Sequence, residues 1–408
     1  MAVISFSEAL TVVNDYAARL SPTEPELASV LDALGLALAE DLVADRDFPP
    51  FARATRDGYA VRAKDVAEVP APLHCIGELK AGASVEQSSI TVRTGEAVEI
   101  MTGAPVPAGA DAVVMVEYTE RSGAEVMVKR TVVAGENVVA AGSEARKGDV
   151  MVSRGTRINH VMVAIAAAIG KADVVACRRP QISILATGDE VVDINLPPGP
   201  NEIRNSNSYS LAAQVSESGG EPLILPVAHD DVNDIEVFVR KGIRSDLLLL
   251  TGGVSMGKYD LVEQVLEKVG AQFFFTGVLI QPGKPLVFGE VGCDGKTAPF
   301  FGLPGNPVST MVTFQLFVRP VLDALAGARP RPPLFAHASL KSGFKTKPGL
   351  TRFLPARLDG THEQPEVELV KWHGSGDLMA MSCANCYIVV PPDREHFETR
   401  ESVTILEF

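Results

Sequence analysis

Apolar residues change their spacing along the chain, and each change marks a different kind of element. They recur at helical intervals from Ala9 to Leu20, directly after Ser5-Phe-Ser-Glu8, which has the spacing of a capping box. The Leu- and Ala-rich stretch from Val30 to Val43 predicts a short helix that runs into a strand. A further helix is expected from His160 to Ile169, capped by Asn159, and its Ala, Val and Ile surface implies burial.

Two other regions follow a β pattern. Short apolar runs separated by turn residues extend from Phe51 to about Glu144 and predict a small β-domain inserted into the helical part. The pattern returns after the linker Ala328–Pro333 and predicts a C-terminal all-β domain. The expected strands are 59–62, 73–79, 97–101, 112–116 and 126–133 in the first region, and 336–340, 352–358, 367–370, 387–390 and 402–406 in the second.

The stretch between these regions, residues 181–326, has the pattern of one α/β unit with four glycine-rich turns. Ligands of an open α/β sheet bind at the carboxyl ends of its strands, so we expect the four turns to meet at one sheet edge. The expected strands are 182–186, 247–250, 273–280 and 299–301, and the expected helices are 208–218, 232–242, 260–269 and 307–325. The turns are Thr187-Gly-Asp-Glu190, Gly252-Gly-Val-Ser-Met-Gly257, Pro282-Gly-Lys284 and Gly302-Leu-Pro-Gly-Asn-Pro307.

These turns suit an anionic ligand. Glycines let backbone N–H groups approach a ligand without a Cβ in the way, and a helix that begins at the turn adds its positive end. Asn306 at the N-cap and Pro307 at the first helical position predict such a helix start. Lys284 adds a mobile cation, and the alternative reading of Lys284 is a solvated surface lysine.

Composition and charge narrow the class of protein. Hydrophobic residues make up 46% of the 408-residue chain, which is enough for several packed domains. The net charge of −14 argues against a nucleic acid or an anionic membrane as partner, because both require a basic surface. The N-terminus has no basic and apolar leader, and no apolar run reaches about 18 residues, so we expect a cytoplasmic protein with no membrane segment. The five scattered cysteines predict no disulfide framework.

A set of motifs in one fixed order makes the chain similar to a known family. It resembles the molybdopterin molybdenumtransferases, which include bacterial MoeA, its plant counterpart and the E domain of gephyrin. The resemblance runs nearly end to end. The motifs that carry it are Thr55-Arg-Asp-Gly-Tyr-Ala60, residues 100–117 with Met101-Thr-Gly-Ala-Pro105, Thr187-Gly-Asp-Glu190, Ile203-Arg-Asn-Ser-Asn207, Gly252 to Gly257, Pro282-Gly-Lys-Pro285, Gly302 to Ser309, Gly374-Ser-Gly376 and Ala384-Asn385.

The resemblance implies an elongated homodimer built from four-part protomers. The parts are a discontinuous helical dimerisation part (1–48 and 145–178), an inserted β-domain (49–144), a molybdopterin-binding α/β domain (179–328) and a C-terminal β-barrel (329–408). Members of this family place molybdate on the dithiolene of adenylyl-molybdopterin and release AMP, with a divalent metal such as Mg²⁺. Their active site lies between the α/β domain of one subunit and the inserted domain of the other. The molybdopterin adenylyltransferase and apo-molybdoenzymes are possible protein partners.

Carried onto this chain, the resemblance implies distinct roles for the motif residues. Glu190, Asp230 and Asp260 would hold the metal, although Asp230 and Asp260 could equally be helix N-caps. Asp57 and Thr102 would handle molybdate, although an Asp-Gly turn also explains Asp57. Catalysis would use Asp57, Thr102, Glu190, Asp230, Asp260 and Lys284. Substrate would contact Glu144, Thr187, Gly188, Asp189, Asn205, Ser206, Asn207, Gly252, Gly253, Val254, Ser255, Gly257, Pro282, Gly283, Pro304, Gly305, Asn306, Pro307 and Ser375, the last of which a surface loop explains nearly as well.

The chain departs from the family pattern at three places, two of which remove a cation. Val139 stands where many relatives have arginine, Ser143-Glu144 replaces a Glu-Asp pair, and Gln281 stands where some relatives have lysine. His229 and His373 lack metal-ligand spacing and are read as ordinary polar residues.

Two rival functions remain. An adenylyltransferase or a nucleotide-pyrophosphate hydrolase could use the same α/β domain, but neither would need Asp57 and Thr102. A non-catalytic cofactor carrier would have no use for the carboxylates.

Overall fold

The structure is a computed structural model that describes residues 3–84, 89–253, 261–293 and 295–408. The chain divides into two compact units. Unit 1 comprises Met1–Ala39, Gly155–Asn159 and Val174–Phe408, and it holds an α/β sheet and a C-terminal barrel. Unit 2 comprises Glu40–Arg154 and His160–Asp173, and it holds a second sheet and one helix.

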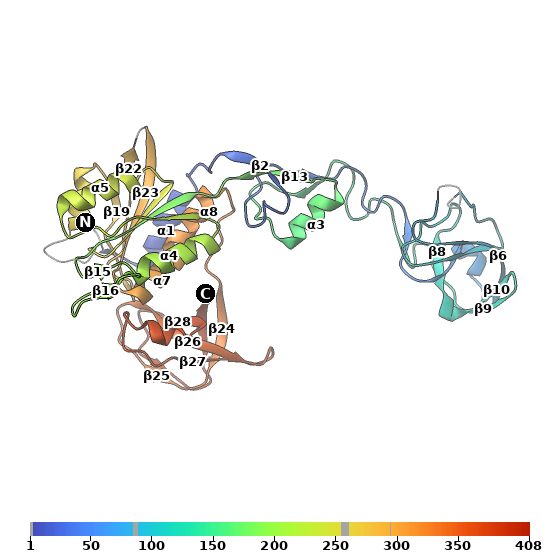
Figure 1. Ribbon diagram of the computed structural model, residues 1–408. Coiled ribbons are helices and arrows are strands. Elements are labelled where there is room, and N and C mark those ends of the chain that lie inside the picture. The colour runs from blue at the N-terminus through green and yellow to red at the C-terminus, as the bar shows by residue number, and fades with distance from the viewer. Residues whose placement is uncertain (1–2, 85–88, 254–260, 294) are drawn as a thin grey trace. The chain divides into compact units, whose positions relative to one another are not determined.

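A six-stranded sheet forms the centre of unit 1, in the order β17-β14-β18-β23-β22-β19. Figure 1 labels its strands β19, β22 and β23. The first four strands run parallel, and β22 and β19 are antiparallel to their neighbours. Every residue of β18 is buried, as expected for a parallel strand that is covered on both faces. The strands are β17 (Glu221–Ile224), β14 (Gln181–Ala186), β18 (Leu247–Thr251), β23 (Lys296–Leu303), β22 (Val287–Cys293) and β19 (Gln272–Phe275).

Helices cover both faces of this sheet because successive side chains of a strand point to opposite sides. Leu247 and Leu249 pack into the core with the helices α1, α4, α7 and α8, whereas Leu248 and Leu250 pack with α5 and α6. The helices are α1 (Phe6–Ala17), α4 (Ser206–Glu217), α7 (Pro307–Thr313), α8 (Arg319–Leu325), α5 (Val232–Gly242) and α6 (Leu261–Lys268).

The predicted helix starts are largely confirmed. Ser5 caps α1 by accepting from the Glu8 backbone N–H, and the Glu8 carboxylate accepts from the Ser5 N–H, which completes the capping box. The long apolar helix at 307–325 contains a π-helical turn, η3 (Phe314–Val318), between α7 and α8. The stretch Pro307–Leu325 is long and apolar enough to cross a membrane, but 83% of it is buried inside the protein, as in a core helix.

Two sequence predictions in unit 1 are wrong. The helix predicted within residues 30–43 does not form, because Gly35 is a poor helix former and the Gly35 and Leu38 N–H groups donate to the distant Ile158 and Thr156 carbonyls. The strand predicted after it is present as β3 (Leu42–Val43). The expected strand 273–280 is three short strands in three sheets: β19, then β20 (Gly277–Val278) beside β1 (Val3–Ile4), then β21 (Ile280–Gln281) beside barrel strand β26.

The C-terminal part of unit 1 is a closed barrel. Five strands pair in a ring, β26-β27-β24-β30-β28 and back to β26, and β21 adds to its edge. The small helix α9 (Leu378–Met381) lies between β27 and β28 in sequence. The strands are β24 (Phe335–Leu340), β26 (Thr351–Gly360), β27 (Pro365–Leu369), β28 (Cys386–Val390) and β30 (Ser402–Glu407), all close to their predicted positions.

Unit 2 contains a mixed six-stranded sheet in the order β8-β5-β7-β6-β10-β9. Both of its faces are buried, because Tyr59 and Val61 enter one apolar cluster and Ala60 enters another. The helix α3 (His160–Ala168) belongs to this unit, whereas α1 lies in unit 1. The strands are β8 (Ala112–Met115), β5 (Gly58–Val61), β7 (Glu96–Ile100), β6 (Ala71–Leu79), β10 (Glu125–Val128) and β9 (Thr119–Ser122), and sequence did not predict β9.

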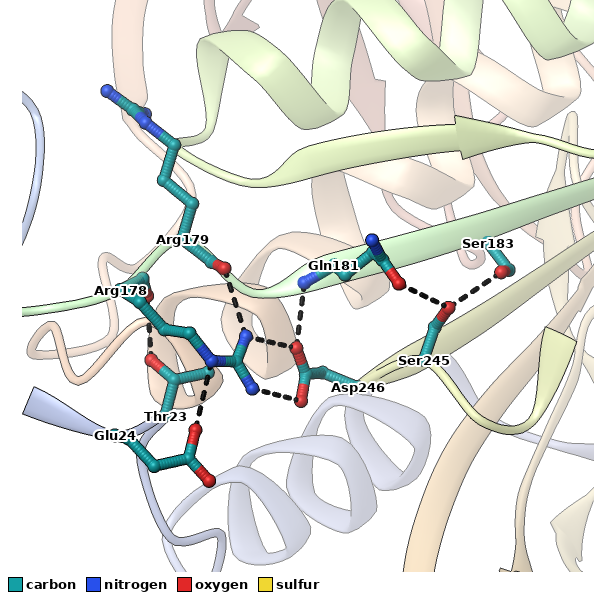
Figure 2. Close-up of polar contacts among 8 residues, drawn as sticks. All are labelled: Thr23, Glu24, Arg178, Arg179, Gln181, Ser183, Ser245 and Asp246. Atoms are coloured by element: carbon teal, nitrogen blue, oxygen red, sulfur yellow. Dashed lines mark hydrogen bonds and ion pairs between the residues drawn. The ribbon is translucent and has the colours of Figure 1, made fainter.

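A network of polar contacts joins the strand ends at the amino edge of the central sheet (Figure 2). The Arg178 guanidinium donates to both oxygens of Asp246, at 2.7 and 3.0 Å, and to the Glu24 carboxylate at 2.9 Å. Asp246 also accepts from the Gln181 N–H, at the first residue of β14. These contacts fix the ribbon of β2 (Pro25–Ser29) and β13 (Asp173–Cys177) to the sheet.

Candidate active site at the carboxyl edge of the central sheet

Three parallel strands end at one cavity. The turns after β14, β18 and β23 contribute Thr187, Gly252 and Gly305 to a cavity of about 330 Å³. This is the edge at which an open α/β sheet binds its ligand. Among the predicted substrate-binding and catalytic residues, those that line the cavity are Thr187, Glu190, Asn205, Ser206, Asn207, Gly252, Gly305, Asn306 and Pro307.

The turn after β18 depends on a glycine. Gly252 has φ +89°, and a Cβ there would lie 2.4 Å from the Thr187 carbonyl oxygen, so another residue would force the two turns apart. The close approach buries Thr187 to 2% exposure. Its Oγ1 is buried and has no hydrogen-bond partner among the residues that the structure describes. A buried hydroxyl without a partner is costly, so this Oγ1 is a natural donor to a bound oxyanion.

Side-chain hydrogen bonds hold the turn after β23 in place. Asn207 Nδ2 donates to the Gly305 carbonyl oxygen at 2.8 Å and to Thr251 Oγ1 at 2.9 Å. Thr310 Oγ1 donates to the Pro304 carbonyl oxygen at 2.6 Å. Asn205 caps α4 by accepting from the Ser208 N–H at 3.1 Å, so the N-terminus of α4 also opens into the cavity. The first turn of α4 contains no acidic residue, which leaves its positive end available to an anion.

Glu190 brings a carboxylate to this edge. Its side chain folds back over Gly188, where φ is +136° and a Cβ would lie 2.6 Å from Glu190 Oε2. Only glycine leaves room for the carboxylate in this position. The next loop is paired with this one, since Thr187 and Ala228 form a β-bridge and Asp189 Oδ1 accepts from the Asp230 N–H at 3.2 Å.

His229 belongs to the same loop pair. Its Nδ1 lies 3.1 Å from Asp189 Oδ1, and both side chains are largely exposed. Asp230, a predicted metal ligand, donates its backbone N–H to Asp189, which directly precedes Glu190 in the chain. The loops that carry Asp230 and Glu190 are therefore neighbours. Within the described ranges, no group of three or more His, Cys, Asp and Glu side chains is close enough to hold a metal. The third predicted ligand, Asp260, lies outside the described residues, as do Val254, Ser255 and Gly257.

The fourth turn reaches the edge by a different route from the one predicted. Pro282-Gly-Lys284 follows β21, which pairs with the barrel and not with the central sheet. It leads into antiparallel β22, whose first residue Val287 pairs with Gly302 near the end of β23. Pro282 and Gly283 are buried, and Lys284 is exposed, with its carbonyl oxygen accepting from the Val278 N–H.

The barrel contributes to the cavity through one loop. The Ser375 carbonyl oxygen accepts from the Val308 N–H at 3.0 Å, and the neighbouring Gly376 and Leu378 line the cavity. Leu378 and Arg204 are lining residues that sequence reasoning did not select. The signal for Arg204 was its place inside the motif Ile203-Arg-Asn-Ser-Asn207, and it supplies a cation to a site with few.

In unit 2 the structure joins Asp57 and Thr102. Asp57 Oδ1 accepts from the Thr102 N–H at 2.7 Å and from Thr102 Oγ1 at 2.8 Å. These two bonds lower the pKa of Asp57 below its usual value, the backbone bond contributing most, so Asp57 is kept ionised.

A second pair in unit 2 involves a residue that sequence did not select. Glu144 accepts from Arg53 Nη2 at 3.1 Å, and Arg53 is the registered partner of Val139 on the adjacent strand. Arg53 therefore supplies a cation beside the position where the family arginine is missing.

Comparison with known proteins agrees with this architecture. Residues 4–170 match the family model of the MoeA N-terminal region (domain I and II), residues 183–324 match a probable molybdopterin binding domain, and residues 337–408 match the MoeA C-terminal region (domain IV). The molybdopterin molybdenumtransferase of Bacillus subtilis is 34% identical over 392 residues, which are 94% of this chain and 90% of the relative.

Two further relatives give the same result. The molybdopterin molybdenumtransferase of a Nostoc species is 34% identical over 95% of this chain and 89% of its own. The crystal structure of the molybdopterin biosynthesis moeA protein from Pyrococcus horikoshii is 29% identical, covers 100% of both chains and superposes with a TM-score of 0.82. The fold and the matched regions define a transferase with a molybdopterin-binding α/β domain. The chain belongs to the molybdopterin molybdenumtransferase (MoeA) family of molybdenum cofactor biosynthesis.

Proposed function

We propose that this protein transfers molybdate to adenylyl-molybdopterin and releases AMP. The observation that carries the proposal is the cavity at the carboxyl edge, where Thr187, Glu190 and Gly252 meet the N-terminus of α4. Such a site combines backbone donors, a buried hydroxyl and a carboxylate, which is what a pyrophosphate ester and its divalent counterion require. The family membership supports a substrate related to molybdopterin.

We infer separate roles for the residues of unit 1. The N–H groups at Gly252 and Gly305, the Thr187 hydroxyl and the positive end of α4 bind the phosphate oxygens. Lys284 and Arg204 add positive charge to the phosphate-binding site. Glu190, Asp230 and Asp260 would hold Mg²⁺, which when bound neutralises charge on the pyrophosphate oxygens. Glu190 lies at the cavity and Asp230 on the loop paired with it, so these two carboxylates fit a magnesium ion that keeps several waters.

For unit 2 we propose that Asp57 accepts a proton from a dithiolene thiol as its sulfur binds molybdenum and passes that proton to a molybdate oxygen, which leaves as water with the two thiol protons. Its pKa is lowered by Thr102, so it is ionised throughout the physiological range. Thr102 holds the carboxylate in one orientation through two hydrogen bonds. This assignment predicts that Asp57 matters only when molybdate is present.

We further propose that the protein works as a homodimer. Three leucines on β2 and the turn after it, Leu27, Leu31 and Leu34, are 72%, 72% and 53% exposed. Side chains of this kind gathered in one short stretch are typical of an interface. In unit 2, Ala166 is the only buried residue among the described residues of the apolar helix α3, so the other apolar side chains of α3 could also form part of an interface. A Leu31→Asp variant that sediments as a monomer where wild type sediments as a dimer would support this.

The remaining proposals concern the setting of the enzyme. None of the five cysteines, all of which lie in the described part of the chain, forms a disulfide, as is usual in a reducing cytoplasm. The product is passed on, so apo-molybdoenzymes are the proposed acceptors, and the molybdopterin adenylyltransferase the proposed donor of substrate.

The test is AMP release from adenylyl-molybdopterin with Mg²⁺, measured with and without molybdate. Wild type is compared with Glu190→Ala and Asp57→Ala. We expect molybdate-dependent AMP release that Glu190→Ala abolishes and that Asp57→Ala reduces strongly. If the protein binds substrate but releases no AMP with any oxyanion, it is a non-catalytic cofactor carrier. If AMP release needs no molybdate and is unchanged in Asp57→Ala, the protein is a nucleotide-pyrophosphate hydrolase.

A further inference from the structure

A second cavity in unit 1 has an apolar wall and a single arginine. It measures about 260 Å³ and lies between α4, the π-helical turn η3 and barrel strand β28. Its apolar wall is formed by Met311, Phe314, Met381, Tyr387 and Phe408. Arg319, the first residue of α8, lies at its polar end. None of these residues lines the cavity at the carboxyl edge.

The carboxylate that Arg319 would normally pair with is already occupied. Asp323 lies one helical turn further along α8 and is fully buried. Its Oδ1 accepts from Arg157 Nη2 at 2.6 Å and from Arg331 Nη2 at 2.9 Å, and its Oδ2 accepts from the Arg331 backbone N–H and Nε, each at 3.2 Å. The cluster therefore contains three guanidinium groups and one carboxylate.

Arg319 is the cation left over. Its Nε is buried and has no hydrogen-bond acceptor, and no carboxylate of the described residues lies within ion-pair distance of its guanidinium. Burial lowers the pKa of Arg319 and the neighbouring Arg331 lowers it further, whereas Asp323 raises it, and the guanidinium remains charged. Arg319 is partly buried and its nearest carboxylate is already bonded to two other arginines, so this end of the cavity favours a negatively charged ligand.

The other described polar side chains that line the cavity add no second cation. Gln214 Nε2 donates to the Ser210 carbonyl oxygen at 3.3 Å, and Gln315 Nε2 donates to the Glu407 carbonyl oxygen. Glu217 lies on the wall and is exposed, and it would repel a second negative charge. One free cation opposite an apolar wall selects a monoanion with an apolar body over a phosphate or a nucleotide, which need several donors.

We propose that this cavity binds a small organic monocarboxylate, with the carboxylate on Arg319 and the apolar body against Phe314, Met381 and Tyr387. The planar guanidinium forms paired hydrogen bonds with a carboxylate, and the volume is near the lower end for small-molecule sites, so the ligand is short. The π-helical turn that ends directly before Arg319 supports the assignment, because such turns are frequent at functional sites. The site does not depend on the transferase reaction.

The test uses benzoate and hexanoate as probes and follows binding to the full chain by calorimetry. Acetate carries the charge without the apolar body, and benzyl alcohol carries the body without the charge. We expect one saturable site per chain for benzoate or hexanoate, and binding about tenfold weaker or more for both controls, because a hydrogen bond to a charged group contributes about 1.5–3 kcal/mol. Equal binding of benzyl alcohol would overturn the proposal, as would no saturable binding of either probe.

Three variants assign the site. Arg319→Met should lose about tenfold or more in affinity, and it should fold, since it removes a partly buried cation that forms no ion pair among the described residues. Ala213→Phe leaves Arg319 in place but fills the cavity from α4, and it should also abolish binding. Glu217→Gln is the matched control and should bind at least as tightly as wild type. Undiminished binding by Arg319→Met or by Ala213→Phe, each verified as folded by its thermal midpoint, would refute the site.

Discussion

The two edges of the central sheet are built in opposite ways. At the amino edge, the charged side chains satisfy one another: Arg178 holds Asp246 and Glu24, and Ser245 lies 2.7 Å from Ser183 (Figure 2). At the carboxyl edge, glycine turns replace side chains, and the Thr187 hydroxyl is buried without a partner among the described residues. The charges of Arg178, Asp246 and Glu24 are paired with one another at the amino edge, whereas the carboxyl edge leaves the Thr187 hydroxyl available to a ligand.

The difference shows where a chain can place binding groups without losing its fold. The amino edge joins β14 and β18 to the ribbon that leads out of the core, so its charges act as structural ties. The carboxyl edge carries the loops between parallel strands, and the Thr187 hydroxyl there has no partner among the described residues. Its polar groups can therefore stay unsatisfied until a ligand binds. The amino edge therefore serves stability and the carboxyl edge serves binding. Variants at the amino edge should lower the free energy of unfolding, and variants at the carboxyl edge should lower activity.

The largest expected effect is on activity at the carboxyl edge. Glu190→Gln keeps the shape of the side chain but removes the charge that faces the cavity, and we expect about a 100-fold loss or more of AMP release, because metal-bound charge stabilises the transition state by several kcal/mol. Glu202→Gln, on the same loop, removes an exposed carboxylate that bonds the Gly199 N–H and does not line the cavity. Its rate should match wild type, and a loss equal to that of Glu190→Gln would remove the special role of Glu190.

At the amino edge the expected effect is on stability. The Asp246 carboxylate holds Arg178 and raises the pKa of that arginine. Asp246→Asn removes this charge, so we expect the free energy of unfolding measured in urea to fall by about 1.5–3 kcal/mol. The rate of AMP release per folded molecule should stay at the wild-type value. A strong loss of rate with unchanged stability would mean that the amino edge takes part in the reaction.

A smaller effect is expected where a glycine makes room for a carboxylate. Gly188→Ala places a Cβ within 2.6 Å of Glu190 Oε2, so the carboxylate must move, and we expect about a tenfold loss of AMP release. Gly292→Ala is the matched control, since a Cβ at that position has no atom within 4 Å. The two variants should differ in rate, and equal rates would show that the position of Glu190 is not important.

The smallest effect concerns the pKa of Asp57. Thr102→Val removes the Oγ1 bond and leaves the N–H bond, so the lowered pKa should rise part of the way towards its usual value. Because the pKa of Asp57 is lower in the folded protein than in the unfolded chain, Asp57 stabilises the fold at pH values above its unfolded-chain pKa. This stabilisation disappears as the pH falls through the pKa of Asp57 in the folded protein. Thr102→Val should therefore shift the acid limb of the rate profile upwards in pH. Carbon-13 NMR titration of Asp57 measures the shift, and Thr102→Ser should show none.

Sequence reasoning recovered the features that local pattern determines. The capping box at Ser5, the buried strand β18 and the glycine turns after three parallel strands all depend on neighbouring residues. It failed where distant segments decide, as at residues 30–43, whose backbone pairs with residues 156–158 and Cys177. The apolar run from Phe273 was divided among three sheets for the same reason.

In the site, too, local pattern predicted some residues and distant contacts decided others. Motif positions such as Thr187 and Gly305 reached the cavity because strand ends place them there. Arg204 and Leu378 were missed because an exposed arginine and a leucine have no distinctive pattern until the loops are folded. The partnership of Arg53 with Glu144 could not be predicted either, since the two residues are brought together by pairing of β4 (Arg53–Ala54) with β11 (Val138–Val139).

The central claim is that the carboxyl edge binds the substrate and the amino edge does not. The most direct measurement is the difference electron density of the protein crystallised with AMP and molybdate. We predict density for the phosphate beside Thr187, Gly252 and Gly305. Phosphate density beside Arg178 and Arg244 at the amino edge, with the carboxyl-edge cavity empty, would contradict the account.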